Sequence, residues 1–139
     1  MAETDATILL VDDDEPTRRT LRRWLNRLNV QVHILEAENG EQALASVKAH
    51  CQATTQPRSL LVLLDLNMPV MDGLEFLEHK AQLPASYQEV ITVVVVSSTP
   101  SDAEKEKART LATEIKLKPL DVDQLLYLIR NYLPGASVV

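Results

Sequence analysis

The sequence predicts an α/β fold, a doubly wound parallel sheet of five strands with helices on both faces. Five strand patterns alternate with five helix patterns along the 139 residues, and such alternation builds parallel sheets. Three of the strand patterns are short apolar runs, as expected for strands buried on both faces. They occupy 7–11, 60–64 and 90–96, and we expect them in the middle of the sheet. The length suits a single domain, residues 1–139.

The composition is that of an acidic globular protein. A total of 20 acids against 14 bases gives a net charge of −6, which argues against generic binding to nucleic acid. The arginines between 18 and 27 recur around one helix, and we interpret them as a solvated face. Cys51 is the only cysteine, and the sequence has neither a secretory leader nor an apolar run of the roughly 20 residues that span a bilayer. We therefore expect a soluble cytoplasmic protein without membrane contact.

The first half of the chain predicts two strands and two helices. The strand at 7–11 runs into three acids, and Pro16 suits the first turn of the helix that follows. Loose apolar alternation at 30–37 predicts a strand near the sheet edge. The turn Asn39-Gly40 opens a short amphipathic helix, and the weakly apolar stretch 51–59 predicts a loop. The two helices are expected at 17–28 and 41–50.

Prolines and glycines divide the second half. The strand at 60–64 runs straight into Asp65, and Gly73 opens the next helix. Asp121 is expected to cap the last helix, which Pro134-Gly135 ends. The other elements expected are helices at 73–83 and 101–111, a loop at 84–89, strands at 90–96 and 115–117, and a tail at 136–139.

Polar side chains follow four of the predicted strands where each strand ends. They are Asp12-Asp13-Asp14, Asp65, Ser97-Ser98-Thr99 and Lys118. Each has an ordinary explanation when taken alone, as a helix cap or a surface lysine. The carboxyl ends of parallel strands meet at one edge of the sheet, where such folds place their sites. We therefore expect these side chains to form one site.

The residue types at this edge indicate its chemistry. Two carboxylates about 4 Å apart repel by roughly 4 kcal/mol at an effective dielectric of 20, so three of them indicate a bound cation. Oxygen ligands without histidine or cysteine suit Mg²⁺ or Mn²⁺. A carboxylate can also be the nucleophile that forms an aspartyl phosphate. Asp65 would then accept a phosphoryl group whose oxygens Lys118 and a serine hydroxyl hold.

Together these segments resemble the receiver domain of two-component response regulators. The resemblance covers about residues 6–133 and implies a flavodoxin-like (βα)5 fold with strand order 2-1-3-4-5. It implies that Asp65 is the phosphoacceptor, and that Ser97 and Lys118 act with it. It also implies a Mg²⁺ site made by Asp12, Asp13, Asp65 and the Asn67 carbonyl. The segments that carry it are 8–14, Asp65-Leu66-Asn67-Met68-Pro69-Val70-Met71-Asp72-Gly73, 93–98 and Lys118-Pro119.

The resemblance also implies partners. A histidine kinase or a phosphotransfer protein would donate the phosphoryl group, and an output protein that the sequence does not identify would receive the signal. The helix at 101–111, the strand at 115–117 and the last helix form the expected output surface, which is also compatible with a homodimer. Because no output domain follows in the sequence, we expect a stand-alone receiver.

The sequence departs from the family pattern at a few positions. Ile115 stands where the family often has an aromatic residue, so no aromatic rotamer switch is expected. Ser98 replaces a frequent alanine, and Asp14 is a third acid that we expect outside the metal ligands. The bond between Lys118 and the following proline is often cis in this family.

Two alternative functions remain open. A phosphohydrolase that uses an aspartyl phosphate usually carries a second aspartate two residues after the nucleophile, where this chain has Asn67. An interaction module that acts without phosphorylation would more naturally have lost Asp13, Asp65 or Lys118, and all three are present. Turnover of a small phosphate ester would favour the enzyme, whereas a single labelling event would favour the receiver.

Overall fold

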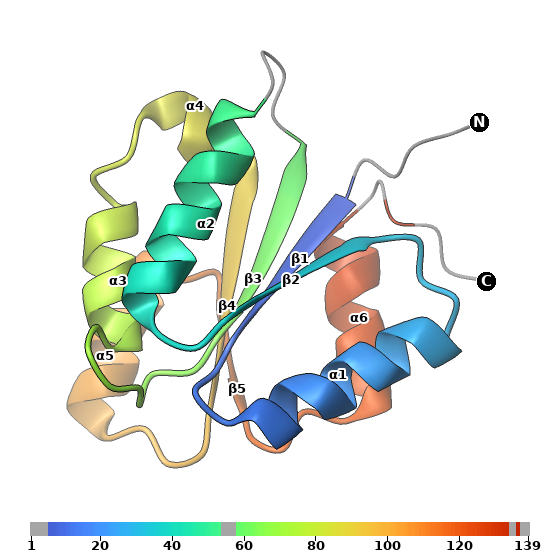
Figure 1. Ribbon diagram of the computed structural model, residues 1–139. Helices are drawn as coiled ribbons and strands as arrows, with labels where there is room; N and C mark the ends of the chain where they lie inside the picture. Colours follow the sequence, from blue (N-terminus) through green and yellow to red (C-terminus); the bar gives the residue numbers. More distant parts are fainter. Residues whose placement is uncertain (1–5, 54–57, 134–135, 137–139) are drawn as a thin grey trace.

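The computed structural model describes residues 6–53, 58–133 and 136, which form one parallel sheet with helices on both faces (Figure 1). The strand order is β2-β1-β3-β4-β5, which confirms the predicted fold class. The strands are β1 (Ala6–Val11), β2 (His33–Ala37), β3 (Ser59–Leu64), β4 (Ile91–Ser97) and β5 (Glu114–Leu117). The helices are α1 (Glu15–Arg27), α2 (Gly40–Gln52), α3 (Gly73–Lys80), α4 (Ala85–Gln88), α5 (Asp102–Leu111) and α6 (Val122–Tyr132).

The side chains of each central strand alternate between two hydrophobic clusters, one on either face of the sheet. In β1, Leu9 and Val11 belong to the first cluster, whereas Ile8 and Leu10 belong to the second. Helices α2, α3 and α5 cover the first face, and α1 and α6 cover the second (Figure 1). The three apolar runs of the sequence are β1, β3 and β4, and they occupy the middle of the sheet as predicted.

Two stretches expected to be loops are partly helical. The stretch 84–89 contains the short helix α4, whose Tyr87 packs against the first cluster. Helix α2 continues beyond 50 because Cys51 is buried and lies four residues after Val47 on the same buried stripe. The predicted loop at 51–59 is therefore wrong at its beginning. The middle of that stretch, 54–57, lies outside the described residues.

Other element ends differ by a few residues. Strand β2 begins at His33 rather than at 30, because Val30 closes α1 through a hydrogen bond from its N–H to the Leu25 carbonyl. Helix α3 ends at Lys80, and the chain tightens into a three-residue turn in which the Leu83 N–H bonds the Lys80 carbonyl. The predicted stop at Pro134-Gly135 lies outside the described residues.

Side-chain caps set the helix starts at the site edge. Asp72, Ser101 and Asp121 each form a capping box at the start of α3, α5 and α6, respectively. The cap predicted at Asp121 is confirmed. Since Ser101 caps α5, Ser97 at the end of β4 is not needed for that task. Within the described ranges, no helix has both the length and the apolar content to cross a bilayer.

Candidate functional site

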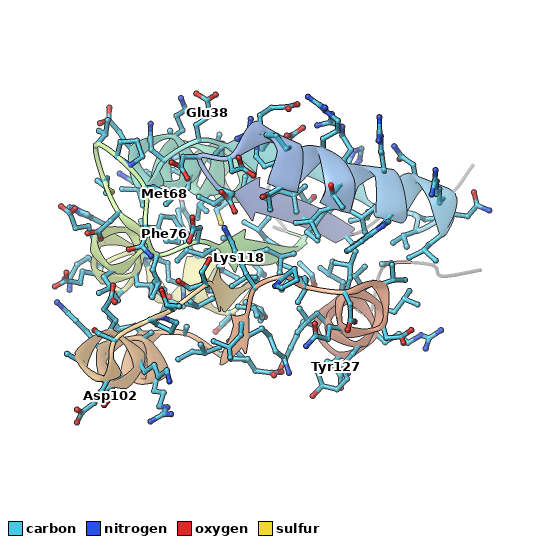
Figure 2. The ribbon with its side chains drawn as sticks, turned by 90° about the horizontal axis from the view of Figure 1, so that it is seen from below. Glu38, Met68, Phe76, Asp102, Lys118 and Tyr127 are labelled. Atoms are coloured by element: carbon cyan, nitrogen blue, oxygen red, sulfur yellow. The ribbon has the colours of Figure 1, made fainter. Side chains whose placement is uncertain are left out.

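The hydrogen-bond ladder of the sheet places the site residues at its carboxyl edge. The Asp12 N–H donates to the Ala37 carbonyl at 3.1 Å, and the Asp65 N–H donates to the Val11 carbonyl at 2.9 Å. The Lys118 N–H donates to the Ser97 carbonyl at 2.9 Å. Figure 2 looks onto this edge from below, with Lys118 near its centre. The residues expected to converge from four strands therefore do so.

An acidic cluster and one ammonium form the centre of the site. Carboxylate oxygens of Asp12, Asp13 and Asp65 all lie within 4.8 Å of one another. The Lys118 Nζ lies 2.6 Å from Asp12 Oδ2 and 3.4 Å from Asp65 Oδ2. Asp12 and Asp65 are buried, whereas Asp13 is exposed. A cation can therefore reach the cluster from solvent on the side of Asp13.

Burial and neighbouring charges change the ionisation of the central pair. Burial raises the pKa of the Asp65 carboxyl, the Lys118 charge opposes this rise, and the Asp12 charge adds to it. Burial alone would lower the pKa of the Lys118 ammonium, but contacts with Asp12 and Asp65 outweigh burial and raise that pKa. Lys118 is therefore a cation at neutral pH. Asp65 is a more basic carboxylate than an exposed aspartate, which favours nucleophilic attack.

The loop after β3 folds back closely over Asp65. The Asn67 N–H donates to Asp65 Oδ1 at 3.3 Å, so this loop contacts the oxygen of Asp65 that Lys118 does not pair. A Cβ on Gly73 would lie 2.4 Å from the Asp65 carbonyl oxygen, so only glycine allows this approach. The structure places Asn67 beside the cluster, and the role of its carbonyl as a ligand stays a prediction.

Ser97 contributes a buried hydroxyl with no protein partner. The side chain is fully buried at the end of β4, and its Oγ has no hydrogen-bond partner among the described residues. Leaving a buried hydroxyl unpaired costs about 1–3 kcal/mol. This cost makes Ser97 a ready donor for an oxygen-rich ligand at the site edge.

Asp14 and Arg18 behave differently from their neighbours. The Asp14 side chain accepts a hydrogen bond from the Thr17 N–H at 3.1 Å and caps α1, which agrees with its expected place outside the metal ligands. Arg18 was predicted to lie on a solvated face, but it is buried and contacts the acidic loop. The helical spacing indicates this burial, since Arg18 lies on the same side of the helix as Leu21 and Leu25.

The cluster fits a hard divalent cation. Its donors are three carboxylates, and such oxygen ligands suit Mg²⁺ better than they suit soft transition metals. A single ammonium, that of Lys118, faces Asp12 and Asp65, so one further cation would balance the remaining charge. The unpaired Ser97 hydroxyl lies at the same edge and can bond the oxygens of an anionic ligand. The residues present therefore suit a site for both a cation and a phosphoryl group.

Comparisons with known proteins identify the family. The family model described as "Response regulator receiver domain" matches residues 8–130. The chain therefore belongs to the response regulator receiver family. Members of this family are phosphoacceptor modules of two-component signalling, and they bind Mg²⁺ through an acidic cluster of the kind found here.

Individual relatives agree with this assignment. Sporulation initiation phosphotransferase F of Bacillus subtilis is 31% identical over 130 residues, which cover 94% of this chain and 95% of that protein. The autoinducer 1 sensor kinase/phosphatase LuxN of Vibrio campbellii is 29% identical over 127 residues, but the match covers 91% of this chain and 13% of LuxN. The chemotaxis protein CheY4 of Vibrio cholerae superposes with a TM-score of 0.70 at 27% identity, covering 92% of this chain and 98% of CheY4.

Proposed function

We propose that this chain is one receiver domain that accepts a phosphoryl group on Asp65 from a phosphohistidine of a histidine kinase or a phosphotransfer protein. The observation that carries the proposal is the environment of Asp65. Its carboxylate is buried beside two other aspartates, one oxygen faces the Asn67 N–H, and the other faces Lys118. Three carboxylates this close together repel one another, so a purely structural role for Asp65 would not explain the cluster.

The protein groups divide the reaction between them. An Asp65 oxygen forms the new bond to phosphorus as the bond from phosphorus to the donor nitrogen breaks, and the imidazole leaves. Lys118, already paired with Asp65, is placed to balance charge on the transferred phosphoryl oxygens. The Ser97 hydroxyl is free to donate to one of them. When bound by Asp12, Asp13, Asp65 and the Asn67 carbonyl, Mg²⁺ would neutralise the carboxylates and the phosphoryl group.

A groove beside Asp65 supports a protein as the phosphodonor. It has a volume of about 200 Å³ and opens between α1 and the β5–α6 loop, next to Asp65 and Lys118. Its walls are mainly apolar, so a helix that presents a phosphohistidine would gain apolar contacts there. The apolar residues that line it are Leu10, Val11, Leu21, Trp24, Leu63, Val96, Pro119 and Leu120.

We place the output surface on α5, β5 and α6, where a homodimer would also form. Leu117 and Tyr127 on this side of the molecule are 57% and 47% exposed, although both are large apolar side chains. The Lys116 Nζ lies 5.1 Å from the Tyr127 ring centroid, so the aromatic group is held in place at the surface. We also place the protein in the cytoplasm, since its only cysteine, Cys51, is a buried free thiol.

The alternative of a phosphohydrolase is less well supported. The position two residues after Asp65 is Asn67, and an amide cannot act as a general acid in place of a carboxyl group. The family is one of regulatory phosphoacceptors, so we propose that turnover is limited to loss of the chain's own phosphoryl group.

Phosphorylation by a small donor such as phosphoramidate tests the proposed function. Asp65→Asn should abolish the acid-labile label, and chelation of Mg²⁺ should abolish labelling of the unaltered protein. Asp14→Asn is the matched control, because it removes an acid at the same edge while keeping a side chain that can cap α1. Acid-labile label that persists in Asp65→Asn would contradict the assignment.

A further inference from the structure

Arg18 is the buried cation of α1, and it reaches the acidic loop from the side. Its side chain is 7% exposed. One terminal nitrogen, Nη1, donates to the main-chain carbonyl of Asp12 at 2.6 Å. The Nε donates to Glu36 Oε1 at 3.0 Å. The guanidinium therefore joins the end of β1 to the edge strand β2 through two bonds in different directions.

The contact with the Asp12 carbonyl fixes more than one residue. The carbonyl of Asp12 and the N–H of Asp13 belong to the same planar peptide group. A donor that holds this carbonyl therefore sets the direction in which the chain leaves Asp12 and enters Asp13. These two residues supply two of the three carboxylates of the acidic cluster. The other hydrogen bonds of Asp12 run from its N–H to the Ala37 carbonyl and from Lys118 and the Asp14 N–H to its side chain, and none of them involves the Asp12 carbonyl.

Glu36 anchors the guanidinium on its far side. It lies in β2 opposite Leu10 of β1, two residues before Asp12. Its two carboxylate oxygens pair with different arginines, Oε1 with Arg18 and Oε2 with Arg22. A planar guanidinium with fixed donors suits this arrangement, since its Nε–H meets a carboxylate while its Nη1–H meets a carbonyl.

We propose that Arg18 is a positioning residue for the Mg²⁺ site, holding the Asp12–Asp13 peptide so that both carboxylates face Asp65. The inference rests on the proposed function, because it assigns the cluster to Mg²⁺. Arg18 itself touches neither the metal nor the phosphoryl group. Residues that orient metal ligands typically change metal affinity 10–100-fold when they are replaced.

The sign of the effect separates positioning from simple charge. Removing a positive charge beside three carboxylates makes their potential more negative, which by itself strengthens the binding of a cation. Loss of ligand orientation weakens it. If Arg18 acted only through its charge, a variant that lacks the charge would bind Mg²⁺ more tightly. If Arg18 only supported the fold, Mg²⁺ binding would be unchanged. A positioning Arg18 predicts weaker binding.

The test measures Mg²⁺ dissociation constants of the unphosphorylated protein from Trp24 emission and from amide NMR shifts. Trp24 is the only tryptophan and lines the groove beside Asp12. Arg18→Gln should weaken Mg²⁺ binding at least tenfold. Arg18→Lys keeps the charge but not the fork, so it should weaken binding about threefold or more. Arg23→Gln, an exposed arginine of the same helix, is the control and should stay within about twofold.

A spectroscopic signature accompanies the affinity. The ¹⁵N shift of the Asp13 amide reports the hydrogen bond to the Asp12 carbonyl, and it should move in Arg18→Lys without Mg²⁺ but not in Arg23→Gln. Arg18→Lys also keeps the proposal testable if Arg18→Gln does not fold. Binding in Arg18→Lys and Arg18→Gln as tight as in the unaltered protein would overturn the inference alone. Unaltered protein that binds no Mg²⁺ would overturn the proposed function and this inference with it.

Discussion

At the scale of single residues, three consecutive acids have three different environments. Asp12 is buried and paired with Lys118, Asp13 is exposed at the cluster, and Asp14 is turned toward the start of α1. Only the first two bring carboxylate oxygens close to those of Asp65. The division follows from backbone direction, since the chain leaves the strand at Asp12 and has begun the helix at Glu15.

Replacing these acids should therefore have separable effects. Asp13→Ala should weaken Mg²⁺ binding far more than Asp14→Ala. Asp14→Ala should instead lower the free energy of unfolding, because it removes the cap of α1. Direct Mg²⁺ binding and urea unfolding of both variants measure the two effects. Equal losses of Mg²⁺ affinity would show that the assignment is displaced by one residue.

The sequence predicted which side chains meet at the carboxyl edge, because they stand at strand ends. Asp12 and Asp65 follow apolar strands, Ser97 closes a third, and Lys118 follows the edge strand β5, so sheet topology alone brings them together. The buried role of Arg18 was missed, because charge suggested exposure although helical phase placed it with Leu21. The close approach that requires Gly73 depends on backbone distances, which no sequence pattern encodes.

At the scale of elements, the two helices beside β5 are anchored very differently. Helix α5 buries a single residue, Ala108, whereas α6 buries Leu125, Leu128 and Ile129. Strand β5 is also tied to α6, since the Tyr132 hydroxyl donates to Glu114 and Lys116 lies over Tyr127. Helix α5 follows the Ser97 loop directly and is the more weakly held of the two. We therefore expect it to belong to the low-stability part of the domain.

Phosphorylation should therefore change residues 97–111 more than Ile115 or α6. A phosphoryl group on Asp65 adds acceptor oxygens that draw on the Ser97 hydroxyl, and the loop that leads to α5 moves with it. Hydrogen exchange with and without a beryllofluoride adduct measures the change. Altered protection around Ile115 and α6, with residues 97–111 unchanged, would show that the signal takes another route.

The tie between β5 and α6 should depend on pH. The hydrogen bond to Glu114 raises the pKa of Tyr132 from 10.0 to about 12. Between these two values the unfolded chain releases the tyrosine proton while the folded protein retains it, so this contribution to stability is complete below pH 10 and is lost as the pH approaches 12.

Alkaline unfolding of variants checks this expectation. Tyr132→Phe should lower the free energy of unfolding at neutral pH, and its deficit relative to the unaltered protein should shrink as the pH rises through this window. Tyr127→Phe is the control, because it keeps an aromatic ring beneath Lys116 while leaving the contact between Tyr132 and Glu114 in place. A deficit that is constant across the window would contradict the assignment.

Element prediction succeeded where apolar residues formed an unbroken run or recurred at helical spacing. The three apolar strands and the helices with several buried positions appear within a few residues of their predicted limits. Helix α4 spans only Ala85–Gln88, too short to show helical periodicity. Cys51 was assigned to a loop because the stretch after it is polar, and its burial depends on packing against the sheet.

At the scale of the whole molecule, strand order determines where the charges meet. Strands β1 and β3 are neighbours in the sheet although they are separated by β2 and two helices in the sequence. Their ends therefore place Asp12 and Asp65 side by side. The repulsion between these two buried carboxylates, which Lys118 balances only in part, destabilises the folded state. A bound metal cation should therefore favour folding.

Mg²⁺ should therefore stabilise the entire domain. At ten times its dissociation constant, a ligand that binds only the folded state raises the free energy of unfolding by about 1.4 kcal/mol. Urea unfolding with Mg²⁺ and with a chelator measures the difference, and Asp13→Ala serves as the control, since it should show little gain. A similar gain in that variant would mean that Mg²⁺ acts elsewhere on the protein.

The unpaired Ser97 hydroxyl has a consequence for the energy landscape of the domain. A buried polar atom without a partner is a local conflict between sequence and fold, a point of frustration in an otherwise consistent core. We expect an oxygen of a phosphoryl group on Asp65 to resolve that conflict, so that phosphorylation would relieve a cost already present in the unmodified protein. Until then the unpaired hydroxyl has a free-energy cost that the rest of the core must offset.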